Sequence, residues 1–233
     1  MTARGLFGLP FIIGIVVLVG AAWLFGGIAE DVVTGDPLVL IDGFISEWFR
    51  SHASPRFATG MHFASALGSG ITVSILSVLA ACVLLWRRQW SWMSGLVVAV
   101  GGGMLLNLML KNLFDRARPG WADPLMALAD FSFPSGHTMM ATILYGFMAI
   151  YLIPTIASWR WRFLVAGAAI LLVFLVALSR MYLGAHYLSD VLAAMAAGSA
   201  WVALCLTAVE TLRRYRLFDA SQIRNRAQGK IAP

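Results

Sequence analysis

Three short polar segments interrupt an otherwise hydrophobic chain, and each lies at the edge of a hydrophobic run. Together they contain three cations, two histidines and one carboxylate that could act on a bound anion. Polar groups at the rim of a membrane span are costly to keep, so they are candidates for function. The first segment holds Lys111, Arg118 and Pro119, the second Pro134, Ser135, Gly136 and His137, and the third Ser179, Arg180, His186 and Asp190.

The cations and the second segment are suited to holding a phosphate group. Phosphoryl transfer needs positive charge near the non-bridging oxygens, which Lys111, Arg118 and Arg180 could supply. Arginine can bind such oxygens with two parallel N–H donors. The second segment is typical of a helix N-terminus, where Gly136 would let the backbone approach an anion and Ser135 would add a hydroxyl donor.

The third segment predicts a nucleophile. His186 and Asp190 are four residues apart, so one face of a helix carries both. A carboxylate that accepts the Nδ1–H bond of the imidazole leaves Nε2 free to attack phosphorus. His137 would protonate the leaving oxygen and then activate the water that hydrolyses the phosphohistidine. A lone histidine at a helix end is more often structural, so the hypothesis depends on all three segments meeting at one site.

Composition indicates an integral membrane protein. Hydrophobic residues make up 60% of the 233 residues, charged residues 12%, and the mean hydropathy is +0.82. A soluble domain would carry about twice that charge. The length suits one domain over 1–233, with a motif-bearing core at 92–210 and a basic tail at 211–233. Cys82 and Cys205 lie inside apolar runs and are interpreted as packing residues.

We predict an all-α fold, a bundle of six transmembrane helices, because about 20 apolar residues cross a bilayer as a helix. The first span is too long for a signal peptide and is interpreted as a retained helix. The fourth and fifth spans are short. Segment 38–50 predicts an amphipathic helix on the outer surface, with interfacial packing favoured over guidance of a lipid. The predicted spans are 7–28, 58–86, 92–114, 138–153, 163–179 and 187–210.

The loop charges predict the orientation of the bundle. Arginines follow the second, fourth and sixth spans, as in cytoplasmic loops, so both termini should be cytoplasmic. All three polar segments would then emerge on the opposite face, which in a bacterium is the periplasm. This placement also argues against nucleic acid as the partner of a chain with net charge +6. The tail should be solvated and partly disordered. These arginines are Arg87, Arg88, Arg160, Arg162, Arg213, Arg214 and Arg216.

The spacing of the polar segments resembles that of the type-2 phosphatidic acid phosphatase superfamily, whose signature is K-x6-R-P, P-S-G-H and S-R-x5-H-x3-D. All eleven named positions are present between residues 111 and 190. The six-span layout resembles the membrane branch of that family. The resemblance implies His186 as nucleophile, Asp190 as its partner and His137 as acid. It implies that phosphate is bound by Lys111, Arg118, Ser135, Gly136 and Arg180, with no metal and no cofactor.

Four other charged residues near these segments are given no catalytic role. Asp115, Asp123 and Asp130 lack the spacing of a metal site and are interpreted as solvated loop charges. Arg116 adds a charge beside Arg118 and could contact either the substrate or a neighbouring lipid.

The expected function is metal-independent hydrolysis of a phosphomonoester or diphosphate group on a membrane lipid, at a site open to the outer leaflet. Undecaprenyl diphosphate, phosphatidylglycerol phosphate and phosphatidic acid are candidate substrates. A lipid phosphotransferase with the same covalent step is an alternative. A transporter of anions or lipid phosphates is an alternative of another class. The expected partners are the lipid substrate and the bilayer, and the oligomeric state stays open.

Overall fold

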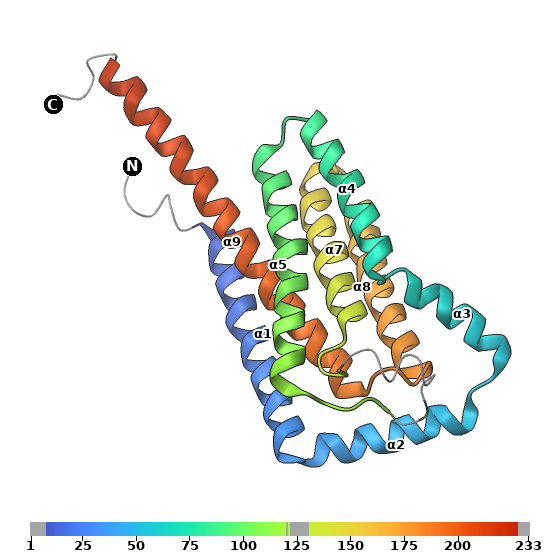
Figure 1. Ribbon diagram of the computed structural model, residues 1–233. Helices are drawn as coiled ribbons and strands as arrows, with labels where there is room; N and C mark the ends of the chain where they lie inside the picture. Colours follow the sequence, from blue (N-terminus) through green and yellow to red (C-terminus); the bar gives the residue numbers. More distant parts are fainter. Residues whose placement is uncertain (1–7, 120, 122–130, 228–233) are drawn as a thin grey trace.

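The computed structural model describes residues 8–119, 121 and 131–227, of which residue 10 and residues 212–227 are described by their backbone alone. This part of the chain is helical, which confirms the predicted all-α fold (Figure 1). A 3₁₀ turn, Ile153–Thr155, follows α7. The helices are α1 (Leu9–Thr34), α2 (Pro37–His52), α3 (Pro55–Ala66), α4 (Gly70–Trp86), α5 (Trp90–Phe114), α7 (Gly136–Leu152), α8 (Trp159–Tyr182) and α9 (Leu188–Ala227).

Six stretches of the described chain are long and apolar enough to cross a membrane, as predicted. The fifth has 24 residues and is longer than the expected span 163–179. Helix α8 also includes polar residues at both ends, such as Arg160 and Arg180, which lie outside the apolar run from which the span was predicted. The fourth reaches 20 residues when the 3₁₀ turn is included. The six are Phe11–Thr34, Pro55–Trp86, Trp90–Phe114, Gly136–Thr155, Trp159–Tyr182 and Leu188–Thr211.

The second span is broken where a single helix was predicted. It contains α3 and α4, which meet at an angle (Figure 1). Ser69 caps α4 by accepting a hydrogen bond from the backbone N–H of Thr72 at 3.2 Å. The hydroxyl of Tyr145 on α7 donates to the carbonyl of Leu67 at 2.8 Å. A break within a membrane-spanning stretch requires such partners for the backbone, and here one of them comes from a helix distant in the sequence.

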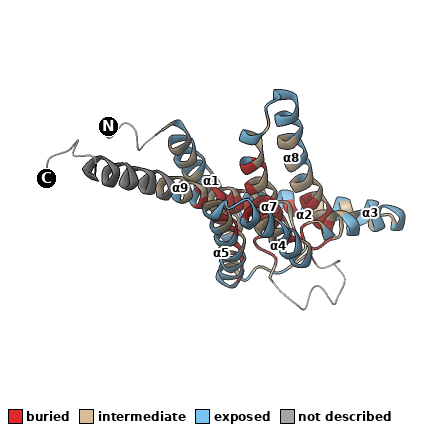
Figure 2. Ribbon diagram, turned by 90° about the horizontal axis from the view of Figure 1, so that it is seen from above, coloured by how far each residue is buried: buried red, intermediate tan, exposed pale blue. Residues whose placement is uncertain are grey.

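The core of the bundle lies around α7 and α9. In the most apolar stretch of each helix, 44% of the residues are buried in α7 and 50% in α9, compared with 6% in α1. Met139, Ile143 and Phe147 on α7 pack with Leu96 on α5 and Ala194 on α9. Figure 2 shows the buried residues gathered in the middle of the bundle around α7. The outer helices present their apolar side chains outward, as lipid-facing helices do.

The loops that carry the polar segments lie at one end of the bundle, which we call the motif end. α5 ends there, and α7 and α9 begin there (Figure 1). The turn between α4 and α5, the start of α8, and the far end of α9 lie at the opposite end. The arginine-bearing loops and the polar segments are therefore separated by the length of the bundle.

Helix α2 lies across the motif end and contains the predicted amphipathic segment 38–50 (Figure 1). Several of its large apolar side chains are exposed, among them Leu40, Phe44 and Trp48, whereas Asp42 is buried. The polar face that sequence alone would assign to solvent therefore includes a carboxylate that points into the protein.

The last helix continues past the membrane-spanning stretch to Ala227. The expectation of a partly disordered tail at 211–233 is thus wrong for the backbone up to that residue. The side chains of 212–227 and all of 228–233 lie outside the described residues, as do Asp123 and Asp130.

Candidate active site

The three polar segments meet at the motif end. Lys111 lies in the last turn of α5, and Ser135 is the N-cap of α7. Arg180 lies in the last turn of α8, and Asp190 in the first turn of α9. Between them, the carbonyl of Arg180 accepts hydrogen bonds from the N–H groups of Ala185 and His186 at 3.0 and 3.3 Å. This turn holds His186 beside the end of α8.

His186 and Asp190 form the predicted pair in a buried setting. Nδ1 of His186 lies 3.5 Å from Oδ2 of Asp190, a distance at the long limit for a hydrogen bond. Such contacts are often long before substrate binds. The same Oδ2 accepts from the hydroxyl of Ser132 and from the N–H of Tyr187 at 2.8 Å. The carboxylate is therefore held by several donors besides the imidazole.

Each of the three cations donates a hydrogen bond to an oxygen of the protein. Nζ of Lys111 donates to the carbonyl of Phe131 at 2.7 Å, and Arg118 donates to the carbonyl of Ala185 at 3.0 Å. Arg180 donates to the hydroxyl of Ser65 at 2.7 Å. Nε of Arg180 is buried without a hydrogen-bond partner in the described part of the chain. A buried charged donor left unpaired is costly, so this position suits an anion.

The second segment forms the start of α7 as predicted. The N–H of Ser135 donates to the carbonyl of Asp190 at 3.1 Å. A Cβ added to Gly136 would lie 3.0 Å from Oδ1 of Asn107 and 3.9 Å from Cε of Lys111. The absence of a side chain there lets the helix N-terminus approach Lys111.

His137 is the second residue of α7 and lies within electrostatic range of His186, Arg180, Arg118 and Lys111. The structure therefore brings all the predicted site residues to one place. Their individual roles stay predictions.

The environment of His186 favours a neutral imidazole. Burial lowers the pKa of His186 from 6.5 to about 4, the charges of Arg180 and Arg118 lower it further, and Asp190 opposes the shift. An imidazole with such a pKa is unprotonated at neutral pH. It can therefore act as a nucleophile without first losing a proton.

Sequence reasoning missed four polar residues around Asp190. Arg116, left open as a contact of substrate or lipid, donates from Nη1 to Asp190 at 2.7 Å and from Nη2 to Asp42 at 2.8 Å. Its guanidinium also lies over the ring of Tyr187, 4.4 Å from the centroid. Asp42, Ser132 and Ser189 complete this group. The charge of Arg116 was visible in the sequence, but its partners come from distant segments.

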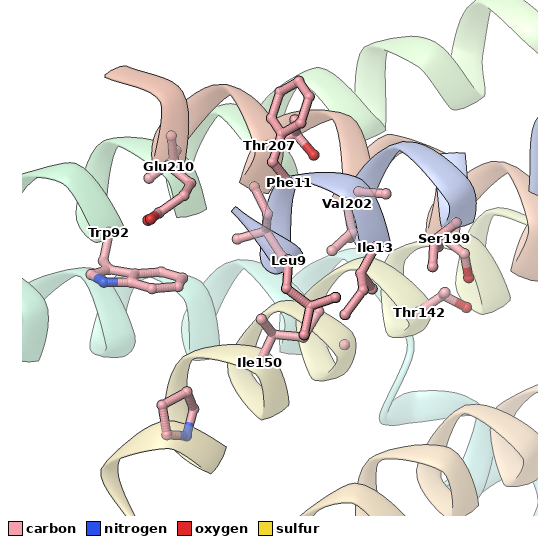
Figure 3. A pocket seen from close by; sticks show the side chains of 17 residues that line it. Leu9, Phe11, Ile13, Trp92, Thr142, Ile150, Ser199, Val202, Thr207 and Glu210 are labelled. Atoms are coloured by element: carbon pink, nitrogen blue, oxygen red, sulfur yellow. The ribbon is translucent and has the colours of Figure 1, made fainter. Parts of the chain in front are cut away.

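An apolar cavity of about 590 Å³ lies elsewhere, between α1, α7 and α9 (Figure 3). Leu9 on α1, Ile150 on α7 and Glu210 on α9 place it toward the end of the bundle opposite the motifs. None of the predicted site residues lines it.

Comparison with protein families and curated relatives agrees with this geometry. A family model described as the PAP2 superfamily matches residues 92–214, which include all the motif residues. The chain is 32% identical over 152 residues to phosphatidylglycerophosphatase B of Bacillus subtilis strain 168, covering 64% of this chain and 72% of that protein. It is 28% identical over 136 residues to an undecaprenyl-diphosphatase of Sulfolobus acidocaldarius, covering 56% of this chain and 61% of the relative.

Two solved structures have the same fold. The crystal structure of a transmembrane PAP2-type phosphatidylglycerolphosphate phosphatase from Bacillus subtilis matches with a TM-score of 0.72 and 30% identity, over 81% of this chain and 93% of that one. Aquifex aeolicus LpxE matches with a TM-score of 0.53 and 22% identity, over 71% and 94%. At this low identity, the similarity to LpxE supports a shared fold and says nothing of activity.

Proposed function

The chain belongs to the PAP2 superfamily and is a membrane phosphatase of that family, and we propose that it hydrolyses the phosphate of membrane lipids through a phosphohistidine at His186. The substrates are phosphomonoesters or diphosphates of the phosphatidylglycerol phosphate, undecaprenyl diphosphate or phosphatidic acid type. The relatives named for the first two of these activities support the choice. The observation that carries the proposal is the buried His186, held between a fixed carboxylate and a group of cations.

In the first step, Nε2 of His186 attacks phosphorus and the bond from phosphorus to the leaving oxygen breaks. His137 gives its proton to that oxygen. Lys111, Arg118 and Arg180 bind the non-bridging oxygens, on which negative charge is concentrated in the transition state. Asp190 stabilises the positive charge that develops on the imidazole as the P–N bond forms.

In the second step, His137 takes a proton from a water molecule that attacks the phosphohistidine. The P–N bond breaks, free phosphate leaves, and His186 returns to its neutral form. A histidine can take both roles because its imidazole can donate a proton in one step and accept one in the next. The Ser135 hydroxyl and the backbone N–H groups at the start of α7 would hold the phosphate throughout.

The motif end faces outward, toward the periplasm in an inner membrane, and both termini are cytoplasmic. The arginines at the opposite end, Arg87, Arg88, Arg160 and Arg162, support this orientation. In a chain with Cys82 and Cys205 replaced by alanine, Glu47→Cys and Gln89→Cys can be labelled in intact cells with an impermeant maleimide. Labelling of Glu47→Cys alone is expected, and labelling of Gln89→Cys alone would reverse the orientation.

The direct test is phosphate release by the purified chain from a panel of lipid phosphates and diphosphates in EDTA. Turnover in the chelator and its loss in His186→Ala are expected. Full turnover by His186→Ala would remove the covalent mechanism, and loss of activity in EDTA would contradict a metal-free reaction. A phosphorylated acceptor lipid in place of free phosphate would assign the chain as a phosphotransferase. Absence of any phosphate release in detergent would favour a transporter.

A further inference from the structure

A second buried carboxylate lies behind the His186–Asp190 pair. It belongs to Asp42, in helix α2, which contains none of the motif residues. Arg116 joins the two carboxylates, since Nη1 lies 2.7 Å from Oδ1 of Asp190 and Nη2 lies 2.8 Å from Oδ2 of Asp42. Asp42 and Asp190 are almost completely buried, with side chains 1% and 0% exposed. One guanidinium thus occupies the space between two carboxylates from distant parts of the chain.

Ser189 forms hydrogen bonds with both Asp42 and Arg116. Its N–H donates to Oδ1 of Asp42 at 2.9 Å, and its hydroxyl donates to Oδ2 of the same carboxylate. Nη1 of Arg116 donates to the Ser189 oxygen at 2.6 Å. Asp42 therefore binds a free N–H group in the first turn of α9, where a negative charge is favourable. The same turn carries Asp190.

We propose that Arg116 and Asp42 are positioning residues for Asp190, an inference that rests on the proposed function. Arg116 holds Oδ1 of Asp190, which leaves Oδ2 directed at Nδ1 of His186. Asp42 holds Arg116 in turn. The role of the amphipathic helix α2 is therefore to fix the orientation of the carboxylate that supports the nucleophile.

The geometry separates this role from phosphate binding. Both Nη atoms of Arg116 are directed at carboxylates of the protein, whereas Arg180 has a buried Nε without a partner in the described residues. Loss of Arg116 should thus reduce the rate of the chemical step and leave phosphate affinity nearly unchanged. Lysine is a poor replacement because a single ammonium lacks the planar fork that reaches both carboxylates.

The experiment compares Arg116→Lys and Asp42→Asn with the wild-type chain, all full length and purified in detergent. The measurements are kcat and KM on a lipid phosphate and the inhibition constant of inorganic phosphate. We expect kcat to fall about 10- to 100-fold, the usual effect of losing a group that orients a functional residue. KM and the inhibition constant should change by less than about twofold.

Glu47→Gln is the matched control. It removes another carboxylate from α2, but Glu47 is exposed and forms a surface ion pair with Arg50 at 3.0 Å. Its kcat should equal that of the wild type. The double variant Asp42→Asn with Arg116→Lys should lose little more than Arg116→Lys alone, because both changes act on the same carboxylate.

Rates are normalised to folded protein, measured by thermal unfolding and size-exclusion chromatography. If Asp42→Asn does not fold, Asp42→Glu, which keeps the charge and moves it by one methylene, takes its place. Wild-type kcat in both single variants would overturn the inference alone, as would a loss of activity matched by weaker phosphate binding. A wild-type chain that releases no phosphate from any lipid would overturn the proposed function and the inference with it.

Discussion

Ser135 donates its backbone N–H to the main-chain carbonyl of Asp190 at 3.1 Å, which joins the start of α7 directly to the start of α9. His137 follows Ser135 by two residues, and His186 lies just before α9. The distance between the two histidines is therefore set by the backbone rather than by flexible side chains. Fixed placement of an acid and a nucleophile contributes substantially to catalysis.

The two steps assigned to His137 predict different behaviour for two kinds of substrate. His137→Ala should reduce turnover of a lipid phosphate by about 10²- to 10⁴-fold, because the leaving oxygen loses its proton donor. With an activated aryl phosphate the first step needs no acid, so phosphohistidine should accumulate in this variant. Radiolabelled phosphate on the protein, sensitive to acid, is the measurement. If the variant hydrolyses both substrates at the wild-type rate, His137 acts in neither step.

Stability should fall on acidification because His186 is buried in its neutral form. Its pKa is lowered from 6.5 to about 4, so as the pH falls the unfolded chain takes up the proton first. The stability that His186 contributes is complete above about pH 6.5 and is lost between there and about pH 4. The loss amounts to about 3 kcal/mol.

The pH effect can be measured as the apparent unfolding midpoint in detergent at pH 7 and pH 4.5. His186→Gln should remove part of the pH dependence, whereas replacement of the exposed His52 by glutamine should leave it intact. An equal pH dependence in wild type and His186→Gln would contradict the assignment.

The close approach of α3–α4 to α7 predicts a sensitive glycine. A Cβ on Gly68 would lie 2.7 Å from the carbonyl oxygen of His137 and from Cγ1 of Val176. Because one neighbour is backbone, Gly68→Ala should destabilise the protein by about 1–3 kcal/mol and displace His137. Gly70→Ala meets nothing within 4 Å and serves as the control. Equal unfolding midpoints and activities for both variants would count against this packing.

Gly136 offers a test of the phosphate cradle. Its added Cβ would press on Oδ1 of Asn107 at 3.0 Å, beside Lys111. Gly136→Ala should therefore raise the inhibition constant of inorganic phosphate, by about tenfold, a cost of roughly 1.4 kcal/mol. Gly146→Ala, on the same helix with open space around it, should bind phosphate normally. Unchanged phosphate binding in Gly136→Ala would exclude this helix N-terminus from the site.

The sequence was sufficient to predict the six spans and the residues that gather at the motif end, because both depend on local patterns. Hydropathy could not reveal the break between α3 and α4, since the carbonyl of Leu67 is satisfied by Tyr145 from another helix. Nor could spacing reveal the partners of Arg116, which lie 74 residues away in each direction. Such pairs depend on the tertiary arrangement and have no periodic signature.

The family match begins at residue 92, yet the carboxylate that holds Arg116 comes from residue 42. A chain trimmed to the matched region would retain every signature residue and leave the partly buried guanidinium of Arg116 with only one of its two carboxylates. We therefore expect the smallest catalytic unit of this protein to be larger than the region by which its family is recognised. Chimeras that exchange the first two helices between relatives should be designed with Asp42 and Arg116 kept as a pair.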